Sequence, residues 1–182
     1  MSSVEGTVAA LRAGEPVLLP TDTVYGLCAD PNAEGARERL AALKGREPEQ
    51  PVALLFADVD AAVERFPAAA QARNLLPGPY TVVVADGEGT VGVRVPELPQ
   101  RAREVVAQVG GVLATSANRH GGADPRRLED VPEEIRSACG AELDGGPLPG
   151  VPSTVIDLTG PEPRIVREGA VTAAEALARL RR

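Results

Sequence analysis

The only lysine of the chain, Lys44, stands two residues before Arg46 in a sequence that otherwise uses arginine for its cations. An ammonium is a compact charge with three donors, whereas a guanidinium is a planar fork, so together they suit a phosphate chain with terminal and bridging oxygens. The pair therefore indicates phosphate binding. A simpler interpretation stays open, in which Lys44 places its charge in the last turn of a helix that ends at Gly45.

Short polar side chains lie beside three apolar runs. Thr21-Asp22-Thr23 follows the run 17–19, and Thr115-Ser116-Ala117-Asn118 follows the run 112–114. Ser153-Thr154 begins a third run after a loop rich in glycine and proline. Polar groups at strand ends can line a pocket at the edge of a sheet, although each segment could also be an ordinary turn with local caps.

The glycine motifs of common nucleotide-binding loops are absent or out of context. Gly87-x-Gly89-x-x-Gly92 has the spacing of a dinucleotide-binding loop, but such a loop must open a helix. Here Val93-Arg94-Val95-Pro96 follows, which predicts a strand and makes the glycines a hairpin turn. Arg94 within that strand points either outward or inward as an anion clamp. The pattern GxxxxGK[ST] does not occur, so any nucleotide must be bound in another way.

Cysteine and histidine offer little for catalysis or metal binding. Cys28 and Cys139 form no CxxC pair, so we expect neither a disulfide framework nor a zinc site. We interpret Cys28 as a core residue. His120, the single histidine, lies in a glycine-rich loop, where we expect it to be exposed.

Length and composition limit the class of protein. A chain of 182 residues predicts one domain, spanning residues 1–182. Its charge of −7 and aromatic content of 2% argue against a stable nucleic-acid-binding surface, which needs clustered cations and stacking platforms. The first fifteen residues include Glu5 and Glu15 and no apolar segment, and no run of about eighteen apolar residues occurs. We therefore expect no membrane association and a cytoplasmic location.

Apolar periodicity and turn residues predict an α/β protein. Its single domain should contain a twisted sheet of parallel and antiparallel strands with flanking helices. The glycine- and proline-rich segment 144–152 should be a loop within that domain. We expect helices at 4–11, 32–43, from 58, from 67, at 99–109 and from a capping box at 172–175, and strands at 17–19, 52–56, 80–85, 90–95, 112–114, 154–158 and 165–167.

Seven short motifs occur in an order that resembles the YrdC/Sua5 family. They are Pro20-Thr21-Asp22-Thr23-Val24-Tyr25-Gly26-Leu27, Lys44-Gly45-Arg46, Pro77-Gly78-Pro79-Tyr80-Thr81, Val93-Arg94-Val95-Pro96, Thr115-Ser116-Ala117-Asn118, Ser153-Thr154-Val155-Ile156-Asp157 and Arg167-Glu168-Gly169. The resemblance covers about residues 14–169 and includes the family signature of Lys-x-Arg joined to Ser-x-Asn. It implies a YrdC-like fold with a concave ligand cleft. Because the chain ends soon after Arg167, it resembles the short single-domain form, and we expect no C-terminal Sua5 domain.

The resemblance implies an enzyme of the nucleotidyltransferase class. Members of the family make threonylcarbamoyl-adenylate for the t6A modification of tRNA. The implied reaction converts L-threonine, bicarbonate and ATP into threonylcarbamoyl-AMP and pyrophosphate, with Mg²⁺ accompanying ATP as its companion ion. Proteins that transfer the t6A group would act downstream, and direct tRNA binding should be weak or absent.

The resemblance also implies the roles of individual residues. Four are expected to be catalytic: Lys44, Arg46, Ser116 and Asn118. The ATP site is expected to contain Lys44, Arg46, Thr90, Asn118, Arg126 and Arg167. The threonine site is expected to contain Thr21, Thr23, Arg94, Ser116 and Ser153, with Arg94 on the threonine carboxylate. No residue is expected to hold a metal.

Several positions depart from the family pattern. Glu47 and Gln50 replace a usual Pro and a usual Lys or Asn, Leu55 replaces a frequent His, and His120 replaces a usual Ser. Two other functions stay open: an RNA-binding module with a positive concave face, and an adenylating protein that resembles a domain of hydrogenase-maturation carbamoyltransferases. Pyrophosphate release that depends on threonine would separate the three.

Overall fold

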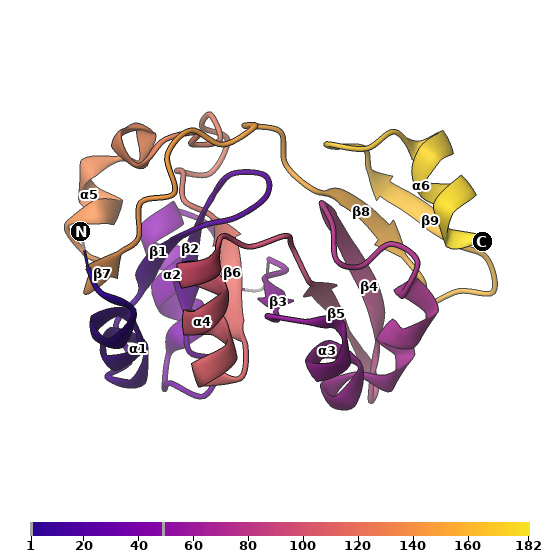
Figure 1. The fold of residues 1–182 in the computed structure, drawn as a ribbon, viewed down its shortest axis with the longest axis horizontal. Helices are drawn as coiled ribbons and strands as arrows, with labels where there is room; N and C mark the ends of the chain where they lie inside the picture. Colours follow the sequence, from indigo (N-terminus) through magenta and orange to yellow (C-terminus); the bar gives the residue numbers. More distant parts are fainter. Residues whose placement is uncertain (1, 49) are drawn as a thin grey trace.

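A computed structural model describes residues 2–48 and 50–182, which fold around one nine-stranded sheet (Figure 1). The strand order is β7-β1-β2-β6-β3-β5-β4-β8-β9. The strands are β1 (Val17–Pro20), β2 (Tyr25–Ala29), β3 (Ala53–Leu55), β4 (Tyr80–Asp86), β5 (Gly89–Arg94), β6 (Val112–Ser116), β7 (Ala141–Glu142), β8 (Thr154–Asp157) and β9 (Arg164–Arg167). The α-helices are α1 (Val4–Arg12), α2 (Ala36–Lys44), α3 (Val59–Arg65), α4 (Gln100–Val109), α5 (Glu133–Arg136) and α6 (Ala173–Leu180), and the 3₁₀-helices are η1 (Pro67–Ala72) and η2 (Leu128–Asp130).

The short strand β3 joins the two parts of the sheet. It pairs in parallel with β5, where Ala53 lies opposite Gly92, and antiparallel with β6, where Ala53 lies opposite Ala114. Figure 1 shows β1, β2, β6 and β7 with helices α1, α2, α4 and α5 on one side of it, and β4, β5, β8 and β9 with α3 and α6 on the other. The predicted α/β class and mixed sheet are confirmed.

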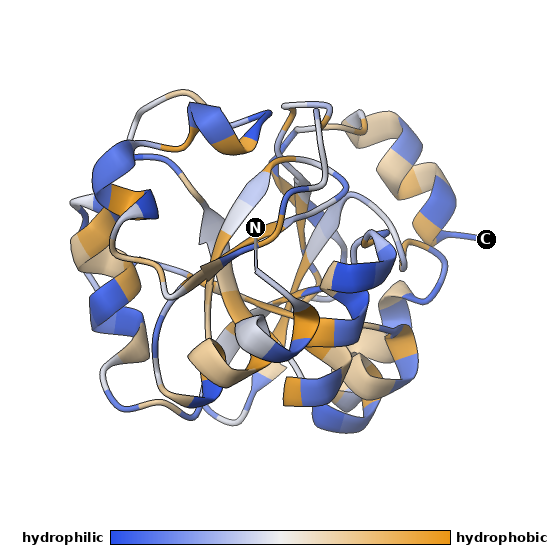
Figure 2. Cartoon of the chain, turned by 60° about the vertical axis from the view of Figure 1, so that its left-hand side comes forward, coloured by the Kyte–Doolittle hydropathy of each residue, from blue (hydrophilic) through white to orange (hydrophobic). Residues whose placement is uncertain are grey.

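The helices cover the two parts of the sheet differently. Around β1, β2 and β6, helices α1 and α4 pack on one face, with Leu11 and Val105 in the core, and α2 and α5 pack on the other, with Leu40 and Ile135. Around β4, β5 and β8, one apolar cluster fills one face beneath α3, η1 and α6. In Figure 2 the helices turn apolar surfaces toward the sheet and hydrophilic surfaces outward. The other face of β4, β5 and β8 is therefore available for a site.

The second predicted helix begins later than expected, and the strand predicted at 52–56 is shorter. The second helix begins at Ala36, and its N-cap is Gly35, whose φ of 68° lies in the left-handed region. Asn32 does not cap it, because the Asp30 side chain accepts the Asn32 N–H at 2.8 Å and holds a separate turn. The strand predicted at 52–56 is shorter, from Ala53 to Leu55.

Three predictions of local structure are confirmed. Strands β4 and β5 form the expected hairpin, with φ of 59° at Gly87 in its turn. Thr172 and Glu175 form the capping box of α6. The segment 144–152 is a loop that runs from β7 to β8 (Figure 1). Tyr25 holds its start, since the hydroxyl lies 2.9 Å from Asp144 Oδ1 and accepts the Gly145 N–H at 3.0 Å.

Candidate functional site

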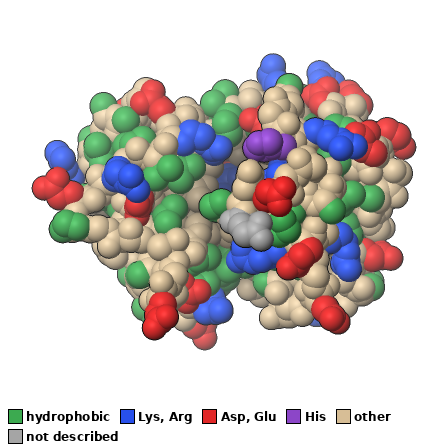
Figure 3. All heavy atoms as spheres, turned by 180° about the vertical axis from the view of Figure 1, so that it is seen from behind, with side chains coloured by type: hydrophobic (Ala, Val, Ile, Leu, Met, Phe, Trp, Pro, Cys, Tyr) green, Lys and Arg blue, Asp and Glu red, His purple; other side chains and the backbone are tan. Residues whose placement is uncertain are grey.

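A cavity of about 770 Å³ lies on the uncovered face of β4, β5 and β8 and extends to β6 and the end of α2. Figure 3 shows this side of the molecule hollowed between its two parts, with the single histidine beside the hollow. A volume of this size is typical of a small-molecule site. The predicted site residues that line it are Thr23, Lys44, Arg46, Thr90, Arg94, Ser116, Asn118, Ser153 and Arg167.

Strand alternation explains why these positions face the cavity. Along β4, Thr81 and Val83 line it, whereas Val82 and Val84 enter the apolar core. Successive side chains of a strand point to opposite faces, so a strand can serve core and site together. Along β5, Thr90, Gly92 and Arg94 line the cavity, whereas Val91 and Val93 enter the apolar core, and Val91 also reaches the lining.

The cavity is cationic although the chain is acidic. Among the described residues that line it, six are basic and only Asp124 is acidic. The basic residues are Arg37, Lys44, Arg46, Arg94, Arg119 and Arg167. With a net charge of −7 over the chain, this concentration of cations indicates a local site for an anion.

Lys44 lies beneath the turn that follows β6. It is the last residue of α2, and Gly45 follows with φ of 64°, so the helix ends where the sequence predicted. Its side chain is only 4% exposed. The ammonium donates to Ser116 O at 2.5 Å, Asn118 O at 2.7 Å and Asn118 Oδ1 at 2.8 Å. Burial, with a contribution from Arg46, lowers the pKa of Lys44 to about 8, and Asp124 opposes this shift.

Arg46 has donors without a protein partner. Among the described residues, nothing accepts from its Nε or Nη2, and both atoms are buried. Burial lowers the pKa of its guanidinium, because the charged form loses hydration. Buried unpaired donors are costly, at about 1–3 kcal/mol each, so an anion that accepts from them would be stabilised here.

Arg94 is held by the loop between β1 and β2. Its Nη2 donates to Asp22 Oδ1 at 3.1 Å and to Thr23 Oγ1 at 3.1 Å. Thr21 lies behind Thr23, with 3.0 Å between their hydroxyl oxygens, and donates to Val24 O at 2.7 Å. The Arg94 Nε is buried, and no described residue accepts from it. The arrangement thus orients a guanidinium and leaves part of it for a ligand.

A second chain of polar contacts crosses from β4 to β9. The hydroxyl oxygens of Thr81 and Ser153 lie 2.8 Å apart in a buried contact. Arg167 Nη2 donates to Ser153 O at 2.8 Å. Ser153 is therefore fixed from two sides, by a strand of the same sheet and by the end of β9.

Some predicted residues lie outside the lining. Thr21 is 3% exposed behind Thr23, and the exposed Arg126 donates through Nε to Leu148 O at 3.3 Å. Leu55, at the position of a frequent family histidine, is 1% exposed in the core beneath α1 and α4. His120 lines the cavity and is exposed, as predicted.

Sequence reasoning assigned no individual role to four residues that line or support the cavity. Asp22 holds Arg94, Thr81 contacts Ser153, Gly92 forms part of the lining, and Asp124 supplies its single described carboxylate. Alternation along the predicted hairpin could have placed Thr81 and Gly92 on the face of Arg94. Asp22 stands in the polar segment 21–23 that the sequence marked as a possible pocket lining, but its pairing with Arg94 had no local signal, because the two residues are far apart in the sequence. Asp124 had no signal of either kind.

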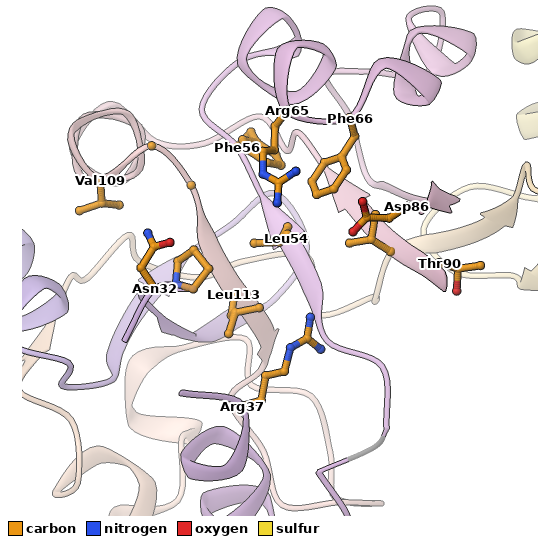
Figure 4. A pocket seen from close by; sticks show the side chains of 14 residues that line it. Asn32, Arg37, Leu54, Phe56, Arg65, Phe66, Asp86, Thr90, Val109 and Leu113 are labelled. Carbon is orange, nitrogen blue, oxygen red and sulfur yellow. The ribbon is translucent and has the colours of Figure 1, made fainter. Parts of the chain in front are cut away.

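A second cavity, of about 440 Å³, lies between the two parts of the sheet (Figure 4). Its lining includes both phenylalanines, Phe56 and Phe66, whose ring centres are 6.1 Å apart, and the Arg65 guanidinium lies over the Phe66 ring. Of the predicted site residues, only Thr90 reaches it among those described. It is therefore not the cavity that gathers the sequence motifs.

Cys28 lies in the core, and the metal-binding side chains of the described residues do not cluster. Cys28 is fully buried in the core, as predicted, and this burial raises the pKa of its thiol to about 12. No cluster of three or more metal-binding side chains occurs in residues 2–48 and 50–182. Across the same residues, no helix has the length and apolarity needed to span a bilayer.

The fold and the cavity define an α/β protein with a cationic ligand site on one face of a mixed sheet. The model of the Sua5/YciO/YrdC family, described as "Telomere recombination", matches residues 9–169. This chain belongs to that family.

Relatives of known name and structure agree with this membership. The threonylcarbamoyl-AMP synthase of Chromohalobacter salexigens is 36% identical over 180 residues, which cover 87% of this chain and 94% of the relative. The crystal structure of Pyrococcus abyssi Sua5 with L-threonine matches with a TM-score of 0.85 at 30% identity, over 97% of this chain. This chain spans 56% of that protein. Escherichia coli YciO matches with a TM-score of 0.81 at 25% identity, over 96% of this chain and 92% of that one.

Proposed function

We propose that this protein is an L-threonylcarbamoyladenylate synthase that acts in t6A modification of tRNA. The observation that carries the proposal is the pair of guanidinium groups, Arg46 and Arg94, which line one cavity and each keep a buried nitrogen without a described protein partner. Two separate anion-binding groups suit a reaction whose substrates are a nucleoside triphosphate and an amino acid with a free carboxylate. The named synthases among the relatives support the same chemistry.

The reaction has two steps. The neutral threonine amine attacks the carbon of bicarbonate, an N–C bond forms, and water leaves to give a carbamate. A carbamate oxygen then attacks the α-phosphorus of ATP, the new O–P bond forms, and the bond to pyrophosphate breaks. The attacking group is already an anion, so positioning and charge stabilisation are the main contributions required of the protein.

The amino acid would lie at the Arg94 end of the cavity. The guanidinium would bind the threonine carboxylate, since Asp22 and Thr23 already orient it. Thr23 and Ser116 offer hydroxyl groups to the substrate hydroxyl and amine, and Ser153 would lie near the bicarbonate-derived group. Thr21, behind Thr23, would act through that residue.

The nucleotide would lie at the Arg46 end. Arg46 would donate to its phosphates, while Ser116 and Asn118 would lie where nucleotide and threonine meet. Thr90 and Arg167 line the same cavity and would contact the nucleotide. Arg126 is exposed outside the lining and would act through its hydrogen bond to Leu148 O.

Mg²⁺ would enter with ATP. Asp124 is the single carboxylate among the described lining residues, which fits an ion carried mainly by phosphate oxygens and water. When bound, the ion would neutralise charge on the leaving pyrophosphate. The proteins that pass the threonylcarbamoyl group to tRNA would act after release of the product.

Pyrophosphate release tests the proposal. Release should require ATP, Mg²⁺, L-threonine and bicarbonate together, and omission of threonine or bicarbonate should abolish it. Valine should fail to replace threonine, because a pocket that hydrogen-bonds a hydroxyl rejects an analogue without it, and serine should be the better substitute. Salt-sensitive RNA binding without any threonine-dependent turnover would instead favour the RNA-binding alternative.

A further inference from the structure

The ammonium of Lys44 has no donor left for a phosphate. An ammonium carries three N–H donors. The three close acceptors are Ser116 O at 2.5 Å, Asn118 O at 2.7 Å and Asn118 Oδ1 at 2.8 Å, and the Ser116 hydroxyl oxygen lies further away at 3.4 Å. All of these oxygens belong to the last residue of β6 and the turn that follows it. With 4% of the residue exposed, Lys44 is enclosed by that turn.

Arg46 shows the opposite arrangement two residues later. Its Nε and Nη2 are buried and have no acceptor among the described residues, although the side chain lines the same cavity. Of the two cations in the signature, Arg46 therefore has donors for an incoming anion, whereas Lys44 would have to break contacts with protein oxygens to reach one.

The contacts of Lys44 set the shape of the Ser-x-Asn turn. Asn118 Oδ1 accepts from the ammonium and also from the Ser116 hydroxyl at 2.6 Å. The other end of the Asn118 amide donates to Gly122 O at 2.6 Å. The chain also closes back on α2, because the His120 N–H donates to Lys44 O at 2.8 Å. Without the ammonium, three oxygens would face one another in a buried space, and the turn would open.

We infer that Lys44 is a positioning residue, which fixes the backbone and side chains of Ser116 and Asn118 and does not itself contact the nucleotide phosphates. The inference rests on the proposed function only for its turnover measurements. It assigns direct phosphate contact in the Lys-x-Arg pair to Arg46.

This inference also explains the single lysine of a chain with many arginines. Three acceptors converge on one nitrogen from the backbone and side chain of a tight turn, and only a compact ammonium presents three donors from one atom. A guanidinium spreads its five donors over three nitrogens in a plane, with at most two on any one of them, so it cannot present three donors from one atom. The site therefore requires lysine for its geometry as well as for its charge.

Hydrogen exchange in the nucleotide-free protein tests the positioning role without relying on turnover. Lys44→Met should increase exchange at the backbone amides of residues 116–122, with Lys44→Arg showing the same local change. Arg46→Met is the matched control, because Arg46 lines the same cavity but its Nε and Nη2 donate no hydrogen bond to any described residue. It should leave those amides protected. Wild-type protection in Lys44→Met or in Lys44→Arg would overturn the inference.

Ligand binding and turnover separate positioning from phosphate contact. Pyrophosphate should bind Arg46→Met at least about tenfold more weakly than wild type, and Lys44→Arg within about threefold of it, because Arg46 supplies the donors. Turnover of Lys44→Arg should nevertheless fall about 100-fold through kcat, since the turn that receives both substrates is displaced. If Lys44→Arg keeps the wild-type kcat, the role of Lys44 is to supply a positive charge to the phosphates, and the inference fails. If Lys44→Met does not fold, Lys44→Arg alone serves for both the hydrogen-exchange and the turnover measurements.

A double-mutant cycle identifies the partner through which Lys44 acts. In an Asn118→Ala background, Lys44→Arg should cost much less in kcat than in the wild-type protein, because the shared contact is already lost. In an Arg46→Met background its cost should stay close to the wild-type value. Coupling of Lys44 to Arg46, with none to Asn118, would contradict the inference.

Discussion

Arg94 Nη2 lies 3.1 Å from Asp22 Oδ1, in an ion pair whose two side chains are each only 11% exposed. Burial raises the pKa of Asp22, and the nearby Arg94 guanidinium opposes that shift. Asp22 Oδ2 also accepts the Glu97 N–H at 3.3 Å, so the carboxylate is tied to the segment after β5. The pair fixes the direction of Arg94 and leaves the Nε nitrogen for a ligand.

Asp22→Asn should therefore impair threonine binding more than nucleotide binding. The neutral amide keeps the shape of Asp22 but loses the charge-assisted contact, so the KM for threonine should rise about tenfold while the KM for ATP changes little. Steady-state kinetics with each substrate varied in turn would measure both. Asp157→Asn is the matched control, because Asp157 pairs with the exposed Arg164 and neither residue lines the cavity. Equal increases in both KM values would contradict the positioning of Arg94 by Asp22.

Thr81 should support catalysis through Ser153. Thr81→Val keeps the size of the side chain and removes the hydroxyl that lies 2.8 Å from Ser153 Oγ, so kcat/KM for threonine should fall about tenfold. Thr81→Ser keeps the hydroxyl and should recover most of that loss. Kinetics of the two variants, with thermal unfolding as the check on folding, separate the hydrogen bond from packing. A valine variant as active as the serine variant would exclude this role.

Gly92 should be needed for space in the cavity. A Cβ there would lie 3.3 Å from Thr81 Cγ2 and 3.6 Å from Ala53 Cβ, both on cavity-lining residues, and the backbone does not demand glycine. Gly92→Ala should fold, yet lower kcat/KM by about 10- to 100-fold, because a small displacement of bound substrates is costly. Gly89→Ala, in the exposed hairpin, is the control and should retain activity. Unchanged activity of Gly92→Ala would show that substrates do not approach this part of the lining.

The pH dependence of turnover should reveal the ionisation of the Lys44 ammonium. Its folded pKa is lowered to about 8 from 10.5, so between these values the unfolded chain binds the extra proton and the contribution of Lys44 to folding stability improves as pH rises. Activity should change in the opposite direction, because above pH 8 the amine has lost one of its three donors. The ratio of wild-type kcat to Lys44→Met kcat should therefore fall as pH rises through about 8, and this ratio cancels the ionisation of threonine and bicarbonate. A ratio that stays flat between pH 7 and pH 9.5 would indicate that the ammonium form is not required.

The sequence by itself determined the fold class and pointed to many of the residues that line the cavity. Period-two alternation in the hairpin and helical periodicity elsewhere predict a mixed sheet with flanking helices, because side-chain burial imposes those periods. The sequence could not predict two strands. The five residues of β2 are all buried and show no alternation, and β7 is only two residues long. The motifs around Thr23 and Ser116 could be recognised because short polar residues at strand ends are local patterns, and the Lys44–Arg46 pair could be recognised because it contains the only lysine of the chain.

Only the tertiary structure decided how those residues divide their work. Lys44 and Arg46 look equivalent in the sequence. In the structure, however, Lys44 donates one of its three hydrogen bonds to the carbonyl oxygen of Ser116, which lies 72 residues further along the chain. The same separation lies between Asp22 and Arg94, and between Thr81 and Ser153. Local sequence fixes the chemistry that a side chain can perform, whereas its partners depend on which strands become neighbours in the sheet. That choice is made by packing across the whole chain, so it decides which cation is enclosed by protein oxygens and which remains open to a ligand.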